Sequence, residues 1–144
     1  MNIKKSAFVF HPQKEIFNLV DKVEDYPNYL PWCDSTSIIQ RNDKSTTASI
    51  GINYKGIKHA FSTKNEKIKF KRMDIKLING PFKYLSGAWT FKKIDNKSCH
   101  IELELEYKFS NIILEKMISP VFNIIANTFI DEFIKEADRR KNER

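Results

Sequence analysis

The hydrophobic period of the chain changes twice, and this change constrains the fold more than any other feature of the sequence. Between residues 35 and 109, apolar side chains recur at every second position, which is typical of strands that bury one face. The alternation is cleanest over residues 98–109. Before and after this region the spacing is that of helices with one apolar stripe. The sequence therefore predicts antiparallel strands with one covered face, followed by one long helix.

Turn-forming residues divide the alternating region into six candidate strands. The strands are predicted at residues 35–41, 46–54, 58–65, 67–76, 86–94 and 98–109. One of the turns is placed at Asn65-Glu66. In the strand that follows it, Lys67 is expected to point away from Ile68. After Phe70 the apolar phase slips, which predicts a bulge near Arg72.

The residues before this region are expected to form one strand and two short helices. The strand is predicted at residues 3–9. Pro12 stands in the favoured first turn of a helix whose apolar residues follow helical spacing from Ile16. A second short helix is expected to begin at Asp25 and to end at Pro31.

The C-terminal helix is expected to cover the sheet without filling its concave side. From Ile112 to Arg140 it would be on the order of 40 Å long, and Pro120 predicts a kink or a division into two segments. A helix is about 10 Å wide with its side chains, which is too narrow for the hollow of a curved seven-stranded sheet. Two outcomes stay open: bulky side chains fill the rest of the hollow, or a cavity remains.

Three stretches of the sequence resemble a known family. They are Tyr26–Cys33, which reads YPNYLPWC, then Asn79–Leu85 with the Gly87-Ala88-Trp89 that follows, and the helical stretch from Pro120 to Phe133. They resemble the coenzyme Q-binding branch of the START-like, polyketide cyclase/dehydrase superfamily, a branch that includes bacterial ribosome-association toxins. The resemblance implies an α+β helix-grip (START/Bet v 1-like) fold for a single domain over residues 1–144. In that fold a seven-stranded curved antiparallel sheet wraps around a long C-terminal helix.

The resemblance also implies that the helix-to-sheet cavity binds ubiquinone or a similar prenylated lipid, with no cofactor required. Leu30, Pro31 and Trp32 would form a lid, and Pro81 with Phe82 the opposing lip. The residues expected to line the cavity are Tyr26, Leu30, Pro31, Trp32, Phe61, Phe70, Pro81, Phe82, Trp89, Tyr107, Val121, Phe122, Ile125 and Phe129. Such a protein would support respiration as a quinone carrier or chaperone. The alternative is an ordinary aromatic core, above all for Phe61, Trp89 and Phe109.

The net charge of +7 is concentrated in one stretch of the chain. Residues 55–83 hold nine lysines and arginines against Glu66 and Asp74, which favours contact with phosphate or anionic lipid. No DNA partner is expected. The candidate contact residues are Lys64, Lys67, Lys69, Lys71 and Arg72. One hypothesis is that they bind the large ribosomal subunit and block subunit association, through the phosphates of structured RNA. Another is a peripheral contact with the inner membrane, and a third is a solvated sheet face.

No exposed aromatic ring is expected between these lysines, so stacking of single-stranded bases fits the pattern poorly.

An enzymatic function receives little support from the sequence, although other helix-grip proteins cyclise polyketides. The chain has no GxSxG, GxGxxG, P-loop or HExxH motif. Its histidines His11, His59 and His100 are dispersed, and Cys33 is expected to be a packed thiol. No catalytic residue and no metal site are predicted.

The sequence also predicts a cytoplasmic protein. The N-terminus lacks the features of a signal peptide. The most apolar window, Met117–Ile130, is too short to cross a bilayer.

Overall fold

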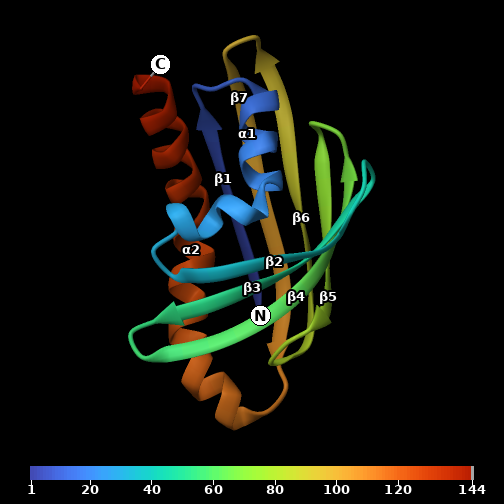
Figure 1. The fold of residues 1–144 in the computed structure, drawn as a ribbon, viewed down its shortest axis with the longest axis vertical. Coiled ribbons are helices and arrows are strands. Elements are labelled where there is room, and N and C mark those ends of the chain that lie inside the picture. Colours follow the sequence, from blue (N-terminus) through green and yellow to red (C-terminus); the bar gives the residue numbers. More distant parts are fainter. Residues whose placement is uncertain (144) are drawn as a thin grey trace.

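Seven antiparallel strands form one curved sheet, and a long C-terminal helix lies along its concave face (Figure 1). The computed structural model describes residues 1–143. The elements are β1 (Asn2–Val9), α1 (Gln13–Asp21), η1 (Val23–Asn28), β2 (Cys33–Arg41), β3 (Ser45–Tyr54), β4 (Ile57–Ile68), β5 (Arg72–Asn79), β6 (Phe82–Asp95), β7 (Ser98–Phe109) and α2 (Ile112–Asn142). The strand order is β1-β7-β6-β5-β4-β3-β2. The predicted helix-grip fold is confirmed.

The alternation of β7 determines which face of the sheet is buried. Leu103 and Tyr107 are almost completely buried, whereas Glu104 between them is exposed. In the neighbouring strand, Trp89 pairs with Leu103 and Leu85 with Tyr107. Apolar side chains of both strands therefore share the concave face and form the core beneath α2.

The predicted turn at Asn65-Glu66 is wrong, because β4 continues to Ile68 and the chain reverses at residues 69–71. Phe70 at that turn has a φ angle of 67°, in the left-handed region, and the N–H of Lys71 donates to the carbonyl of Ile68 at 2.9 Å. The slip in the apolar phase is thus produced by a hairpin turn, and the bulge expected near Arg72 is absent from the β4–β5 pairing. The irregularity of that pairing lies instead between Ser62 and Thr63.

The longer β4 reverses the expected orientation of its last two residues. The side chain of Lys67 is only 7% exposed, and its Nζ lies 3.1 Å from a carboxylate oxygen of Asp21 in α1. Ile68, by contrast, is 59% exposed. An inward lysine is tolerated here because a carboxylate from another element compensates its charge.

The first helices follow the prediction, with one difference. Pro12 precedes α1, which buries Ile16 and Val20 on its apolar face. The second expected helix is a 3-10 helix, η1, which ends at Asn28, before the predicted end at Pro31. This shortening is consistent with the short runs typical of 3-10 helices.

The long helix α2 is continuous through Pro120, so the alternative of two separate helices is wrong. Both Pro120 and Lys116, whose carbonyl loses its helical partner at the proline, are exposed and accessible to water. The side chain of Asn111 caps the helix by accepting from the N–H of Leu114 at 2.9 Å.

By length and composition alone, α2 also qualifies as a candidate membrane span. Its buried residues, which include Ile118, Phe122 and Ile130, belong to the hydrophobic core shared with the sheet. A helix that packs in the core of a protein has the same apolar composition, so the composition of α2 agrees with its packing against the sheet.

Candidate ligand-binding cavity

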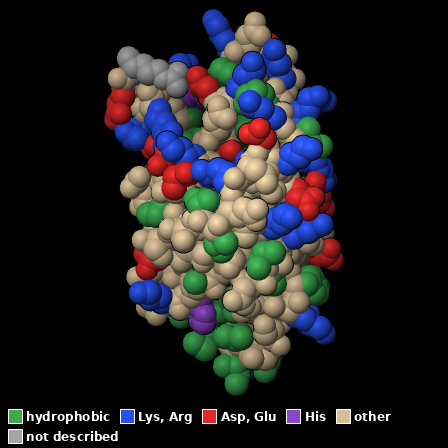
Figure 2. All heavy atoms as spheres, turned by 45° about the vertical axis from the view of Figure 1, so that its right-hand side comes forward, with side chains coloured by type: hydrophobic (Ala, Val, Ile, Leu, Met, Phe, Trp, Pro, Cys, Tyr) green, Lys and Arg blue, Asp and Glu red, His purple; other side chains and the backbone are tan. Residues whose placement is uncertain are grey.

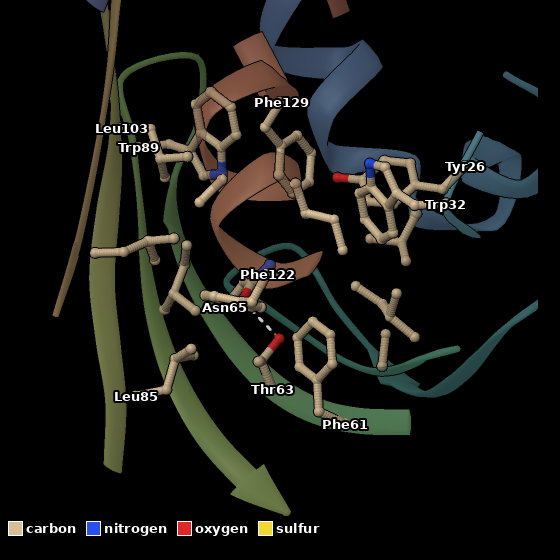
Figure 3. Close-up of a pocket in the computed structure, with 17 residues that line it drawn as sticks. Tyr26, Trp32, Phe61, Thr63, Asn65, Leu85, Trp89, Leu103, Phe122 and Phe129 are labelled. Carbon is tan, nitrogen blue, oxygen red and sulfur yellow. Dashed lines mark hydrogen bonds between the residues drawn. The ribbon is translucent and has the colours of Figure 1, made fainter. Parts of the chain in front are cut away.

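A cavity of about 70 Å³ lies between α2 and the concave face of the sheet (Figure 3). Residues from η1, from β3 to β7 and from α2 line it, and so does Trp32 in the segment between η1 and β2. Most of the lining is aliphatic or aromatic. Binding pockets for drug-sized ligands usually measure about 300 to 1,000 Å³. The cavity is therefore too small for a large guest unless the surrounding side chains move.

The structure brings half of the expected lining residues to this cavity. Those that line it are Tyr26, Trp32, Phe61, Trp89, Phe122, Ile125 and Phe129. Four others, Leu30, Phe82, Tyr107 and Val121, are buried in the surrounding core. Pro31 is exposed, Pro81 is half-buried beside the start of β6, and Phe70 lies at the β4–β5 turn.

Packed aromatic rings explain why the cavity is small. Phe129 of α2 lies 5.3 Å from the ring of Trp32 and 5.7 Å from that of Trp89. On the side of Leu85, Phe82 packs against Phe61 at 6.1 Å and against Phe122 at 5.2 Å. Both outcomes left open by the sequence therefore occur together: rings fill most of the hollow, and a small cavity remains.

Two polar side chains of β4 face the cavity. Thr63 Oγ1 donates a hydrogen bond to Asn65 Oδ1 at 3.1 Å, and this bond is visible below the centre of Figure 3. The two amide hydrogens of Asn65 are not used by that bond. The lining residue Trp32 adds an indole Nε1 that is buried without a hydrogen-bond partner. The cavity thus combines an apolar wall with a few polar groups, as ligand sites commonly do.

Sequence reasoning missed Thr63 and Asn65, because it ended the strand at residue 65 and assigned Asn65 to a turn. The signal that could have found them is the period of two. Phe61, Thr63, Asn65 and Lys67 continue one inward-facing row along β4.

No residue lining the cavity is acidic or basic, a histidine or a cysteine. Tyr26 donates its hydroxyl to the carbonyl of Val20, and burial raises the pKa of this phenol well above its usual range. Burial also raises the pKa of the nearby Cys33 thiol to about 11, so it stays protonated at neutral pH. The cavity therefore offers hydrogen bonds and apolar contact rather than a nucleophile or a general base.

Within residues 1–143, no group of three or more His, Cys, Asp or Glu side chains is arranged to hold a metal ion.

The five basic residues singled out in the sequence do not form one surface. Lys67 is paired with Asp21, and Arg72 lies 2.9 Å from a carboxylate oxygen of Asp74. Lys64, Lys69 and Lys71 are exposed. Figure 2 shows Lys and Arg side chains gathered toward the upper end of the face in view.

Comparison with known proteins decides the family. Residues 9–134 match the sequence profile of the family described as polyketide cyclase / dehydrase and lipid transport. The chain belongs to this family. The resemblance found in the sequence is therefore confirmed.

Relatives within the family have two kinds of names. The chain is 30% identical over 136 residues to Ribosome association toxin RatA of Pseudomonas aeruginosa, and the alignment covers 94% of each protein. It is 20% identical over 127 residues to Coenzyme Q-binding protein coq10, mitochondrial, of Schizosaccharomyces pombe, covering 85% of this chain and 77% of that protein. This START-like protein is thus related to RatA toxins and, more distantly, to coq10.

Among solved structures, the Zhui aromatase/cyclase of Streptomyces sp. R1128 superimposes with a TM-score of 0.81 at 13% identity. The match covers 97% of this chain and 94% of that chain, and it shows a shared fold.

Proposed function

We propose that this protein binds ubiquinone or a related prenylated lipid in the helix–sheet cavity, and that it acts as a carrier or chaperone without chemistry of its own. The observation that carries the proposal is the apolar cavity with its Thr63–Asn65 pair. The apolar wall suits a prenyl tail, and the amide hydrogens of Asn65 suit the carbonyl oxygen of a head group. The distant coq10 relative supports this choice of ligand.

Binding of such a ligand requires the rings around the cavity to move. Phe61 and Phe129 are the aromatic lining residues that are only half-buried, so they can rotate at the smallest cost in lost packing. Each ~100 Å² of apolar ligand surface buried in their place would contribute roughly 2.5 kcal/mol. A few isoprene units can therefore offset the contacts that the opening removes.

Extraction of the purified protein with organic solvent, followed by mass spectrometry, tests this proposal. We expect a prenylated lipid in the wild-type extract after native expression. Ala126→Leu should exclude it, because Ala126 is 1% exposed and lines the cavity. Ala60→Leu is the matched control, because Ala60 is exposed and lies outside the cavity lining. A wild-type extract without prenylated lipid would contradict the proposal.

We propose association with the large ribosomal subunit, and the resulting block of subunit association, as a second candidate function. The relationship to RatA over 94% of the chain favours it, and so does the net charge of +7. Such a role places the protein in the cytoplasm, where a quinone carrier would also meet the inner membrane.

Sedimentation of cell extracts with added protein tests the second function. We expect comigration with large subunits that weakens steeply as salt concentration rises, because phosphate contacts release counterions. A protein that stays at the top of the gradient at low salt would contradict it.

A further inference from the structure

We propose that one end of the molecule is a docking surface for structured RNA that presents an unpaired base. We call this surface the basic tip, and it consists of Lys14, Lys69, Lys71, Lys92 and Lys93 together with Phe8 and Phe10. The inference rests on the second candidate function and specifies its contact surface.

Contacts between three separate segments assemble the lysines of the basic tip. Lys14 of α1 and Lys69 of the β4–β5 turn both lie over the ring of Phe70, with Nζ 5.4 Å and 5.1 Å from its centroid. The N–H of Phe91 in β6 donates to the carbonyl of Lys71 at 2.8 Å. Gln13 in α1 donates to the carbonyl of Phe91 at 2.8 Å, and so joins all three segments.

One surface hollow connects the lysines on the sheet side of the tip. Lys71, Lys92 and Lys93 border it together with His100 and Glu102. Contacts within the chain therefore bring these lysines together.

The charges of the basic tip are available to a partner. Within residues 1–143, none of its five lysines lies within ion-pair distance of a carboxylate, whereas Lys67 and Arg72 nearby are both paired. The cation–π contacts of Lys14 and Lys69 leave their charges uncompensated. A cluster of uncompensated lysines attracts a polyanion.

Two exposed aromatic rings lie at and just beyond the end of β1. Phe8 is 73% exposed and Phe10 81% exposed. Strand pairing places Phe8 opposite His100, and His100 opposite Lys92. The Phe8 ring lies 4.7 Å from the imidazole of His100. The sequence expectation concerned only the lysines between residues 64 and 72. At the tip, strand pairing brings a ring from β1 to a lysine from a distant part of the chain.

Rings and lysines together match RNA with a loop or bulge. Proteins that recognise RNA commonly stack unpaired bases on aromatic side chains while lysines contact the phosphates. A flat anionic membrane fits less well. The outer face beside the tip carries Glu102, Glu104 and Glu106 along β7, and these carboxylates would approach the lipid phosphates as well. A ridge of RNA phosphates can follow the lysines away from Glu104 and Glu106, which lie farther along β7 than His100. Glu102 borders the tip, where Lys4 compensates its charge at 3.4 Å.

A matched pair of triple variants tests the position of the surface. Lys71→Glu/Lys92→Glu/Lys93→Glu removes the tip charge. Lys83→Glu/Lys108→Glu/Lys116→Glu changes the net charge equally, with exposed lysines at the start of β6, the end of β7 and the start of α2. Binding is measured by fluorescence anisotropy on a hairpin RNA with unpaired adenosines in its loop. We expect the tip variant to bind at least ~10-fold more weakly. Its plot of log affinity against log salt concentration should be less steep by ~2. The control variant should bind within ~3-fold of wild type.

The stacking contact has its own test. Phe10→Ala should weaken binding to the hairpin by roughly 10-fold, because an unpaired base loses its platform. On a blunt duplex with the same stem, the same variant should bind as wild type does. Ile113→Ala, at a residue 67% exposed near the start of α2, is the matched control and should leave both affinities unchanged.

Three results would overturn the inference. The two triple variants could lose affinity equally, which would indicate diffuse attraction. Phe10→Ala could weaken duplex and hairpin alike. The wild-type protein could bind phosphatidylglycerol vesicles and not the hairpin, which would identify a membrane surface.

Sedimentation separates failure of this inference from failure of the ribosomal function. If the tip variant comigrates with large subunits as well as wild type does, the inference is wrong and the ribosomal function stands. If wild type binds the hairpin through its tip but does not comigrate with large subunits, the ribosomal function is wrong and the RNA surface stands.

Discussion

The cavity and the basic tip differ in how their side chains are satisfied before any partner binds. In the cavity, aromatic rings pack against one another, and Thr63 and Asn65 bind each other. At the tip, the lysines have no carboxylate partner among the described residues, and Phe10 is 81% exposed. A guest in the cavity must therefore displace packed rings, whereas a partner can reach the exposed side chains of the tip without opening the core. Binding in the cavity is coupled to rearrangement, and binding at the tip depends chiefly on salt.

The largest difference is expected in stability. Trp89 is 4% exposed and packs against Phe129 and Phe133 at 5.7 Å and 5.6 Å. Trp89→Ala should lower the free energy of unfolding by ~3–5 kcal/mol, because it leaves an unfilled space among these rings. Lys92→Ala, at the tip, should change it by less than ~0.5 kcal/mol. Urea denaturation measures both, and similar losses in the two variants would break the comparison.

Thiol reactivity should separate the buried core from the exposed tip by about two orders of magnitude. Burial raises the pKa values of Cys33 and Cys99 to about 11, which leaves little thiolate at pH 8. A cysteine introduced by Lys92→Cys is exposed and should react with a disulfide reagent on the order of 10²-fold faster. The wild-type rate should rise with pH as the thiolate forms. Rapid labelling of wild type at pH 8 would show that the core around Cys33 and Cys99 is accessible to the reagent.

The two ion pairs near the tip should differ in coupling energy, and the more buried pair should be the stronger. Lys67 and Asp21 are 7% and 26% exposed, whereas Arg72 and Asp74 are both 43% exposed. Double-mutant cycles with Lys67→Met and Asp21→Asn should give a coupling energy of ~1 kcal/mol. The same cycle on Arg72 and Asp74 should give less than ~0.5 kcal/mol, because water screens exposed charges. Equal coupling energies would contradict the buried orientation of Lys67.

The smallest effect is expected for Phe10. Removing its ring by Phe10→Ala should change the free energy of unfolding by less than ~0.5 kcal/mol, since the ring is mostly in water. Thermal or urea unfolding can measure this directly. A loss above ~1 kcal/mol would mean that the ring contributes to the core and is not free for a partner.

Sequence periodicity predicts the bounds of an element well when no contact with another element changes which of its side chains face inward. β7 and α2 lie close to their predicted bounds, because apolar residues at a regular period identify a buried face without knowledge of the partner. The last part of β4 could not be predicted in this way. Lys67 faces inward only because Asp21 of α1 meets it, and a local pattern contains no information about that contact.

The sites were predictable to different degrees for the same reason. The aromatic lining was predicted in part, since Trp32, Trp89 and Phe129 belong to stretches that resemble the family. Of the basic tip, only Lys69 and Lys71 were predicted. Phe8 and Lys92 are more than eighty residues apart in the sequence, and only the pairing of β1, β7 and β6 brings them together.

Fluorescence titration tests the central claim, ligand binding in the cavity, most directly. Both tryptophans of the chain, Trp32 and Trp89, line the cavity, so a quinone bound there must quench them. Titration with a short-tailed ubiquinone should quench the emission of wild type and of Ala60→Leu to saturation, and should leave Ala126→Leu unquenched. Absence of quenching in wild type, or equal quenching in folded Ala126→Leu, would contradict the account.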